Sequence, residues 1–216
     1  MTKVKICGIT NLDDALAATN AGADFLGFIF YEPSPRYVSP ETVAEIISGV
    51  KSQVPGELPK FVGVFVNASL EWVEQILDDC RLDAAQLHGD ELAEFVNHFQ
   101  QRAYKVLRPQ SLEDAKELAI EYLPPSPSSL LPYFLLEAYH PTLYGGTGHV
   151  TDWTMAATIA AQYPIMLAGS LTPANVVEAI RAVNPWGVDV SSGVEVEKGK
   201  KDHEKVKQFV NNVRSV

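Results

Sequence analysis

Short apolar runs alternate with longer amphipathic stretches along the whole chain. Most of the runs are rich in Val, Ile, Leu and Phe, which is typical of strands that are buried on both faces. The longer stretches repeat their apolar residues every three to four positions, which is typical of helices with one buried face. We expect strands at residues 4–7, 24–30, 61–66, 84–87, 103–107, 133–137, 165–168 and 187–190.

The predicted helices fall between and after these strands. They cover residues 12–20, 40–50, 70–79, 91–100, 112–122, 153–162, 173–183 and 202–213. Four of them follow a residue whose side chain can accept a hydrogen bond from the first helical turn, namely Asn11, Ser69, Ser111 and Thr172. A strand followed by a helix eight times over is the order of a (β/α)₈ barrel, so we predict an α/β fold of the TIM-barrel type.

Length and composition agree with one barrel and exclude several classes of protein. The chain has 216 residues, of which 46% are hydrophobic, and this suffices for a single domain over residues 1–216. Its net charge of -10 argues against nucleic acid or an anionic membrane as a partner. We expect a cytoplasmic protein, because no leader-like or membrane-length apolar run is present. The two cysteines lie far apart, so neither a disulfide framework nor a zinc site is indicated.

The first predicted strand ends in a thiol, and a glycine follows it at once. Side chains alternate along a strand, so Lys5 and Cys7 share one face while Val4 and Ile6 share the other. If the polar face points into the barrel, Cys7 lies at the carboxyl end of its strand, where barrel enzymes keep their active sites. Cys7 is therefore a catalytic candidate. A cysteine that only packs in the core is the alternative.

Two other polar residues follow predicted strands at the same end of the barrel. Arg36 is the only cation of its loop and lies next to Pro35, and its planar guanidinium suits a carboxylate. His88 follows the fourth strand and could line a pocket for an aromatic ring. For Arg36 a solvated surface arginine is the alternative, and for His88 a hydrogen-bonded rim histidine.

Glycines concentrate after the last three predicted strands, in the segments YGGTGH, LAGSLTP and DVSSGVE. Glycine lets backbone amides approach an anion, and barrels commonly bind phosphate with the loops after strands seven and eight. We expect these loops to form a phosphate site from Gly146, Gly169, Ser170, Ser192 and Gly193. No Walker or GxGxxG motif is present, so no nucleotide cofactor is indicated, and no histidine pair has the spacing of metal ligands.

Eight segments occur in order over nearly the whole chain, namely KICGIT, GADFLGFIF, SPRYVS, GVFVN, QLHGDE, YGGTG, LAGSLTPANV and DVSSGVE. In these segments the chain resembles the phosphoribosylanthranilate isomerase family of tryptophan biosynthesis. The resemblance implies a (β/α)₈ barrel and a cofactor-free Amadori rearrangement, an aldose–ketose isomerisation. The implied substrate is N-(5'-phosphoribosyl)anthranilate and the implied product is 1-(2-carboxyphenylamino)-1-deoxyribulose 5-phosphate. Oligomeric state is left open between monomer and homodimer.

The resemblance also implies roles for individual residues. Cys7 stands where the family has its general base, and Arg36 stands where the family holds the anthranilate carboxylate. The family's general acid is an aspartate at the end of the sixth strand, and this chain has Glu137 there. Ser170 replaces a usual glycine, and His149 stands where a lysine is common. If the Ser170 loop needs a positive backbone angle, we expect strain of about 1 kcal/mol.

The rearrangement requires an acid and a base on opposite sides of one sugar. Glu137 and Cys7 end strands that are not neighbours, so their side chains can flank a substrate across the barrel mouth. A thiol with an ordinary pKa near ~8.5 is mostly protonated at neutral pH, so a nearby cation should assist it. Lys5 is the candidate, and we expect Asp189 on the adjoining eighth strand to pair with its buried amine.

Two alternatives remain open on the sequence. One is a related isomerase of histidine biosynthesis, or a version that accepts both substrates. That relative has an aspartate where Cys7 stands and phosphate sites in both halves, whereas this chain has glycine loops only in its carboxyl half. The other is a catalytically impaired, ligand-binding paralogue, which the changes at Glu137 and Ser170 suggest. The retention of Cys7 and Arg36 argues against it.

Overall fold

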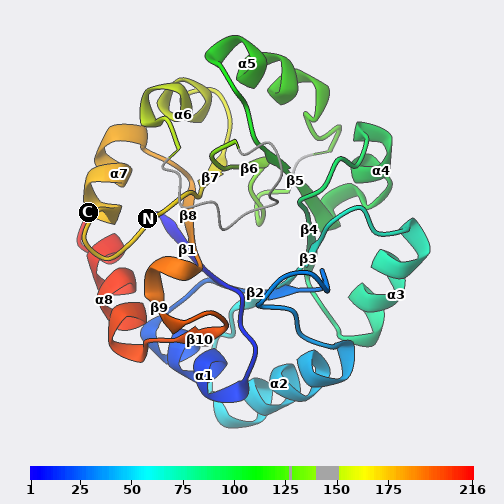
Figure 1. The fold of residues 1–216 in the computed structure, drawn as a ribbon, viewed down its shortest axis with the longest axis vertical. Helices are drawn as coiled ribbons and strands as arrows, with labels where there is room; N and C mark the ends of the chain where they lie inside the picture. The colour runs from blue at the N-terminus through cyan, green and yellow to red at the C-terminus, as the bar shows by residue number, and fades with distance from the viewer. Residues whose placement is uncertain (127, 140–150) are drawn as a thin grey trace.

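Eight parallel strands close into a barrel in the order in which they occur along the chain. The computed structural model describes residues 1–126, 128–139 and 151–216. In Figure 1, which looks along the barrel, the strands form the inner ring and the helices the outer ring. The strands are β1 (Lys3–Cys7), β2 (Phe25–Ile29), β3 (Lys60–Phe65), β4 (Ala84–Leu87), β5 (Ala103–Leu107), β6 (Phe134–Leu136), β7 (Ile165–Leu167) and β8 (Gly187–Val190). The predicted TIM-barrel fold is confirmed.

A helix follows each strand of the barrel and packs on its outside (Figure 1). The helices are α1 (Leu12–Ala21), α2 (Pro40–Gln53), α3 (Leu70–Asp79), α4 (Ala93–His98), α5 (Leu112–Glu121), α6 (Trp153–Ala160), α7 (Val176–Val183) and α8 (His203–Arg214). Asn11, Ser69 and Ser111 each accept a hydrogen bond from the first turn of their helices, as predicted. None of the helices in the described part of the chain has the length and apolar character that a bilayer span requires.

Apolar side chains form two layers, one on each side of the sheet. Val4 and Ile6 belong to the outer layer, between the strands and the helices. The inner layer fills the barrel with side chains such as Phe25, Tyr104 and Met166. The outward face of β1 is therefore apolar, and its other face points into the barrel. The predicted inward direction of Lys5 and Cys7 is thus confirmed, since fully buried Lys5 contacts Gln86 of β4 across the barrel.

Two predicted helix starts are wrong, because side chains there make other contacts. Thr172 does not cap a helix. Its N–H instead donates to the Asn175 side chain, and α7 begins at Val176, directly after Asn175. Residue 91 is not helical, because buried Glu91 accepts hydrogen bonds from the N–H groups of Asn67 and Gly89 and pairs with Lys105 at 3.0 Å.

A hairpin after β8 was not predicted. Its two short strands are β9 (Glu195–Glu197) and β10 (Lys200–Lys201). Asp14 of α1 accepts a hydrogen bond from the N–H of Lys201 at 2.8 Å and another from His203. Figure 1 shows the hairpin beside α1 on the side of the barrel that carries β1. The hairpin thereby brings the carboxyl-terminal segment next to the end of the first strand.

Candidate active site

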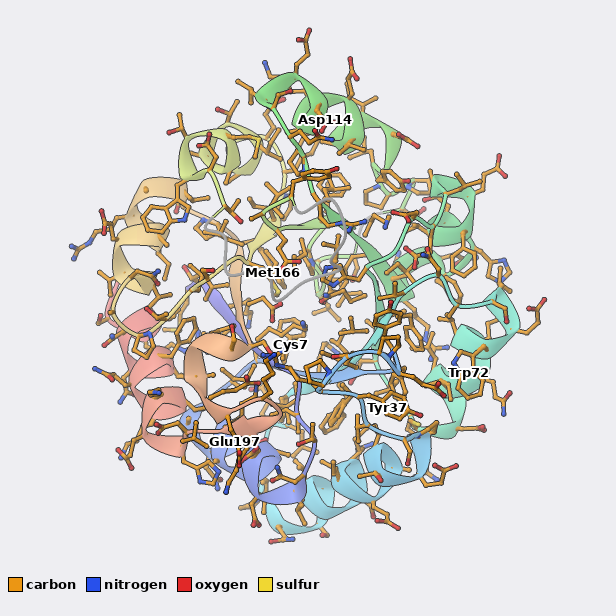
Figure 2. All side chains as sticks on the ribbon, in the orientation of Figure 1. Cys7, Tyr37, Trp72, Asp114, Met166 and Glu197 are labelled. Atoms are coloured by element: carbon orange, nitrogen blue, oxygen red, sulfur yellow. The ribbon has the colours of Figure 1, made fainter. Side chains whose placement is uncertain are left out.

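The predicted site residues meet at one rim of the barrel, because parallel strands in a barrel all end at the same rim. Cys7 is the last residue of β1, and Glu137 directly follows β6. His88 directly follows β4. Figure 2 places Cys7 toward the middle of the ring, whereas Trp72 and Asp114 lie among the outer helices. Gly146 of the predicted phosphate site lies outside the described residues.

Cys7 is buried, with 5% of its surface exposed, and its thiol lies against Gly27 of β2. A Cβ atom on Gly27 would stand 2.7 Å from Cys7 Sγ and 3.1 Å from Lys5 Cε, so the missing side chain makes room for the thiol. Burial raises the pKa of the Cys7 thiol, while the charge of Lys5 and a hydrogen bond from its ammonium oppose this rise. Lys5 is therefore the cation that favours the thiolate most strongly, and the charge of Lys201 adds to its effect.

Replacement of Gly27 by alanine is expected to lower kcat about tenfold, since misplacing a reacting group by about 1 Å costs roughly 100-fold and this change is smaller. The added methyl group would displace the Cys7 thiol, which can rotate away, so the fold should survive. Steady-state kinetics and thermal unfolding measure both effects. Gly56→Ala is the control, since nothing lies within 4 Å of its Cβ position, although its φ of +100° costs some stability. Wild-type kcat in Gly27→Ala would show that the thiol position does not matter.

Lys5 and Asp189 form the ion pair that the sequence predicted. Lys5 Nζ lies 3.1 Å from Asp189 Oδ1 and donates a second hydrogen bond of 2.8 Å to Gln86 Oε1. Burial works to lower the pKa of Lys5, but the charge of Asp189, its hydrogen bond and the nearby Cys7 and Tyr104 together outweigh burial, and the pKa is raised. Lys5 therefore remains an ammonium inside the barrel.

Gln86 connects this pair to the other side of the rim. Its Oε1 also accepts a hydrogen bond of 3.0 Å from the Tyr104 hydroxyl. Its Nε2 lies 3.3 Å from His88 Nδ1, and His88 Nε2 lies 2.8 Å from Glu137 Oε2. The candidate acid and the candidate base are thus parts of one continuous polar network. The sequence pattern indicated no role for Gln86.

Arg36 binds a carboxylate of the same chain. Its Nε and Nη2 lie 2.8 and 2.9 Å from the two carboxylate oxygens of Glu195. Lys201 Nζ lies 2.9 Å from the same carboxylate. Burial alone would raise the pKa of Glu195, but the hydrogen bond from Arg36 and the charge of Lys201 outweigh it and lower the pKa. The guanidinium is therefore held in a fixed orientation rather than free in solvent.

Glu195 and Lys201 are site residues that the sequence analysis missed. They belong to the hairpin β9–β10, whose sequence EVEKGKK consists mostly of charged residues. This composition is typical of a solvated turn. The fully buried Lys201 side chain becomes recognisable only once the hairpin is seen folded over the rim.

The two glycine loops within the described residues contact each other at the rim. Gly169 and Ser170 after β7 both have positive φ, at 95° and 52°, so Ser170 has the strained conformation that was expected. A Cβ atom on Gly193 would collide with the carbonyl oxygen of Leu171, so glycine is required there for the loop after β8 to reach the loop after β7. Asn175 donates to the carbonyl of Ser170 and fixes the first loop. The two loops thus meet at the same rim of the barrel, and their role as a phosphate site stays a prediction.

Within the described part of the chain, no group of three or more His, Cys, Asp and Glu side chains could hold a metal ion. The second cysteine lies away from the site. Cys80 is buried at the end of α3, and its Sγ donates to the carbonyl of Pro40 at 3.4 Å. Its contacts are those of a structural thiol.

Comparison with known proteins identifies the family of the chain. The model of the family described as N-(5'-phosphoribosyl)anthranilate (PRA) isomerase matches residues 4–212. The chain belongs to the phosphoribosylanthranilate isomerase family. A phosphoribosylanthranilate isomerase from Geotalea uraniireducens is 47% identical to it over 219 residues, which cover 100% of both proteins.

Solved structures of the phosphoribosylanthranilate isomerase family have the same fold over their whole length. The enzyme from Thermotoga maritima is 37% identical, with a TM-score of 0.86 and coverage of 100% of both chains. A second structure of a family member, in complex with reduced 1-(o-carboxyphenylamino)-1-deoxyribulose 5-phosphate, is 36% identical, with a TM-score of 0.83 and the same coverage. The fold and the family expected from the sequence segments are both confirmed.

Proposed function

We propose that this chain isomerises N-(5'-phosphoribosyl)anthranilate to 1-(2-carboxyphenylamino)-1-deoxyribulose 5-phosphate in tryptophan biosynthesis. The reaction is an intramolecular oxidation and reduction of the aldose–ketose type. The observation that carries the proposal is the joining of Cys7 and Glu137, through Lys5, Gln86 and His88, across the rim of a barrel that belongs to this family. The proposed mechanism needs no cofactor, since acid and base act on the substrate directly.

Glu137 acts first, as the general acid. It gives its proton to the ring oxygen of the ribose, the bond between this oxygen and C1 breaks, and the nitrogen lone pair forms a C=N bond. The product of this step is an open-chain iminium ion. The partly exposed Glu137 side chain, at 12%, can reach a sugar above the rim while His88 holds its other oxygen.

Cys7 then acts as the general base. The iminium makes the C2 proton acidic, and the Cys7 thiolate removes it. The electron pair of the C–H bond forms a C1=C2 bond and neutralises the nitrogen. The resulting enol loses its hydroxyl proton and gains a proton at C1, which gives the ketose. Lys5 assists the thiolate, and Asp189 keeps Lys5 charged and in place.

The remaining candidate residues bind the two ends of the substrate. A guanidinium has two edges that can each bind a carboxylate, and Glu195 occupies the Nε–Nη2 edge of Arg36. The anthranilate carboxylate would bind at the second edge, formed by Nη1 and Nη2, with the aromatic ring toward His88. The phosphate would bind at the loops that contain Gly169, Ser170, Ser192 and Gly193, and at Gly146.

Replacement of Arg36 by methionine is expected to raise KM about tenfold or more with a smaller effect on kcat, since hydrogen bonds between charged groups are worth about 1.5–3 kcal/mol. Steady-state kinetics with the natural substrate measures this change. A substrate analogue without the carboxylate is the control, because it should lose little when Arg36 is replaced. Equal losses for both substrates would contradict a role of Arg36 in binding the carboxylate.

The proposed function is tested by following the fluorescence of N-(5'-phosphoribosyl)anthranilate with the purified protein. Steady consumption with formation of the ketose supports the proposal. Binding without turnover would point to an impaired paralogue. Turnover of the histidine-pathway aminoaldose in addition would point to a dual-substrate enzyme.

The proposal extends to the partners and the location of the protein. The partner is a small phosphorylated molecule rather than nucleic acid or a membrane, in keeping with the net charge of -10. We place the protein in the cytoplasm, as a monomer or a homodimer with one barrel over residues 1–216. Light scattering of the purified protein distinguishes the two oligomeric states.

A further inference from the structure

The orientation of the Gln86 side chain follows from its two donors. Its Oε1 lies 2.8 Å from Lys5 Nζ and 3.0 Å from the Tyr104 hydroxyl. An ammonium can only donate hydrogen bonds, so the group of Gln86 that faces Lys5 must be its oxygen. Burial raises the pKa of Tyr104, so its hydroxyl also keeps its proton and donates. The Gln86 NH₂ group must then point the other way.

The NH₂ group of Gln86 faces His88 Nδ1 at 3.3 Å. An amide NH₂ is only a donor, so Nδ1 must accept and carries no proton. The single proton of the neutral imidazole is therefore on Nε2, which lies 2.8 Å from Glu137 Oε2 and donates to it. A second proton on Nδ1 would point at the NH₂ group and would lack an acceptor.

We propose that Gln86 and His88 are positioning residues for Glu137. Gln86 fixes His88 as the neutral tautomer with its proton on Nε2, and His88 thereby holds Oε2 of Glu137. Oε1 is left to carry the proton that is transferred to the ribose. This inference rests on the proposed function, because it assigns an orientation to the proposed general acid.

The surroundings of His88 support this assignment. The charged and titratable groups that face the network are Lys5 and Cys7 of β1, Tyr104 of β5, Glu137 after β6 and Asp189 of β8. The negative charge of Asp189 is neutralised by Lys5, so Glu137 is the acidic group that His88 contacts directly. A glutamate has one more rotatable bond than the family's aspartate. The hydrogen bond from His88 removes that additional freedom.

The tautomer of His88 can be measured directly by ¹⁵N NMR of the full chain with labelled histidine. Its signals are assigned as the set that disappears in His88→Gln. In the neutral ring we expect a protonated Nε2 and an unprotonated Nδ1. A neutral ring with its proton on Nδ1 would overturn the proposal. This measurement requires no turnover, so it is independent of the proposed function.

The isosteric variant Gln86→Glu tests the consequence for catalysis. Its carboxylate still accepts hydrogen bonds from Lys5 and Tyr104, but its other oxygen can now accept a hydrogen bond from Nδ1–H, so His88 should carry a proton on Nδ1. We expect kcat to fall about tenfold with KM nearly unchanged, together with the appearance of an Nδ1–H signal. Gln75→Glu on the exposed face of α3 is the control, and it should match the wild type.

Each result decides a different point. If Nδ1 becomes protonated in Gln86→Glu and kcat does not change, the positioning role is wrong. If the variant does not fold, the NMR spectrum of the wild type still decides the tautomer. If the wild-type protein has the expected tautomer but no isomerase activity, the proposed function fails and the structural assignment remains.

Discussion

Replacement of Cys7 by alanine is expected to lower kcat by about 1,000-fold, within the range for loss of a general base. No other thiol can substitute, because Cys80 is buried at the end of α3 on the outside of the barrel. KM should change little, since the thiol acts on a proton rather than on the phosphate or the carboxylate. Stopped-flow and steady-state measurements with the natural substrate give both constants.

The pH dependence gives a second signature of Cys7. A general base works in its deprotonated form, and burial raises the pKa of this thiol despite the charge of Lys5. The rate at low substrate should therefore keep rising with pH up to or beyond the ordinary thiol value of about 8.5. Lys5→Met removes the opposing charge, so the rise should move to still higher pH. A rate that stops rising near neutral pH would contradict a raised pKa of Cys7.

Cys80→Ala is the matched control for Cys7→Ala. Burial raises the pKa of Cys80 to about 11, so this thiol stays protonated at neutral pH, and its Sγ donates to the carbonyl of Pro40. Its replacement should leave kcat, KM and the pH profile unchanged, at a modest cost in stability. Near wild-type turnover in Cys7→Ala would mean that another group removes the C2 proton.

The barrel could be predicted because its signals are local. Each strand is a short apolar run, and helix starts such as Asn11, Ser69 and Ser111 depend on contacts three residues apart. The inward direction of Cys7 also followed from alternation along a single strand. The order of the strands then required no further information, since neighbours along the chain are neighbours in the barrel.

The parts that were missed depend on contacts between distant residues. Arg36 and Glu195 are separated by 159 positions, and Asp14 and Lys201 by 187. Lys201 is charged and lies in a charged hairpin, so its sequence surroundings favour exposure. Only the folded chain shows that Glu195 and the carbonyl of Ser191 surround its ammonium. The Lys5–Asp189 pair could be predicted despite a sequence separation of 184, because β1 and β8 must be neighbours in a closed barrel.

Glu137 shows why part of the candidate site was predictable and part was not. Its position at the end of the sixth strand followed from the strand pattern, although β6 itself ends one residue earlier, and the predicted acid role came from the resemblance to the family. The hydrogen bond of 2.8 Å to His88 depends on the relative positions of β4 and β6, which are separated in the sheet by β5. The pattern of residues along the chain could not decide whether His88 lines an aromatic pocket or binds a polar partner. The structure shows a polar partner for Nε2, and contact of His88 with an aromatic ring of the substrate stays a prediction.

Replacement of Glu137 by glutamine is expected to lower kcat by about 100-fold or more, since an amide cannot give a proton to the ring oxygen. The shape of the side chain is unchanged, and the glutamine Oε1 can still accept the hydrogen bond from His88 Nε2. Stability should therefore stay close to that of the wild type. Single-turnover fluorescence measurements should show that substrate still binds but that ring opening is slow.

Glu137→Asp separates the chemistry of the acid from its position. It keeps a carboxyl group but shortens the side chain by one methylene, so the contact with His88 is lengthened or lost. We expect a rate between those of the wild type and Glu137→Gln, because a misplacement of about 1 Å costs roughly 100-fold but leaves proton transfer possible. If Glu137→Gln retained nearly full activity, some other group would have to protonate the sugar. If Glu137→Asp fell as far as Glu137→Gln, the contact with His88 would be as important as the proton itself.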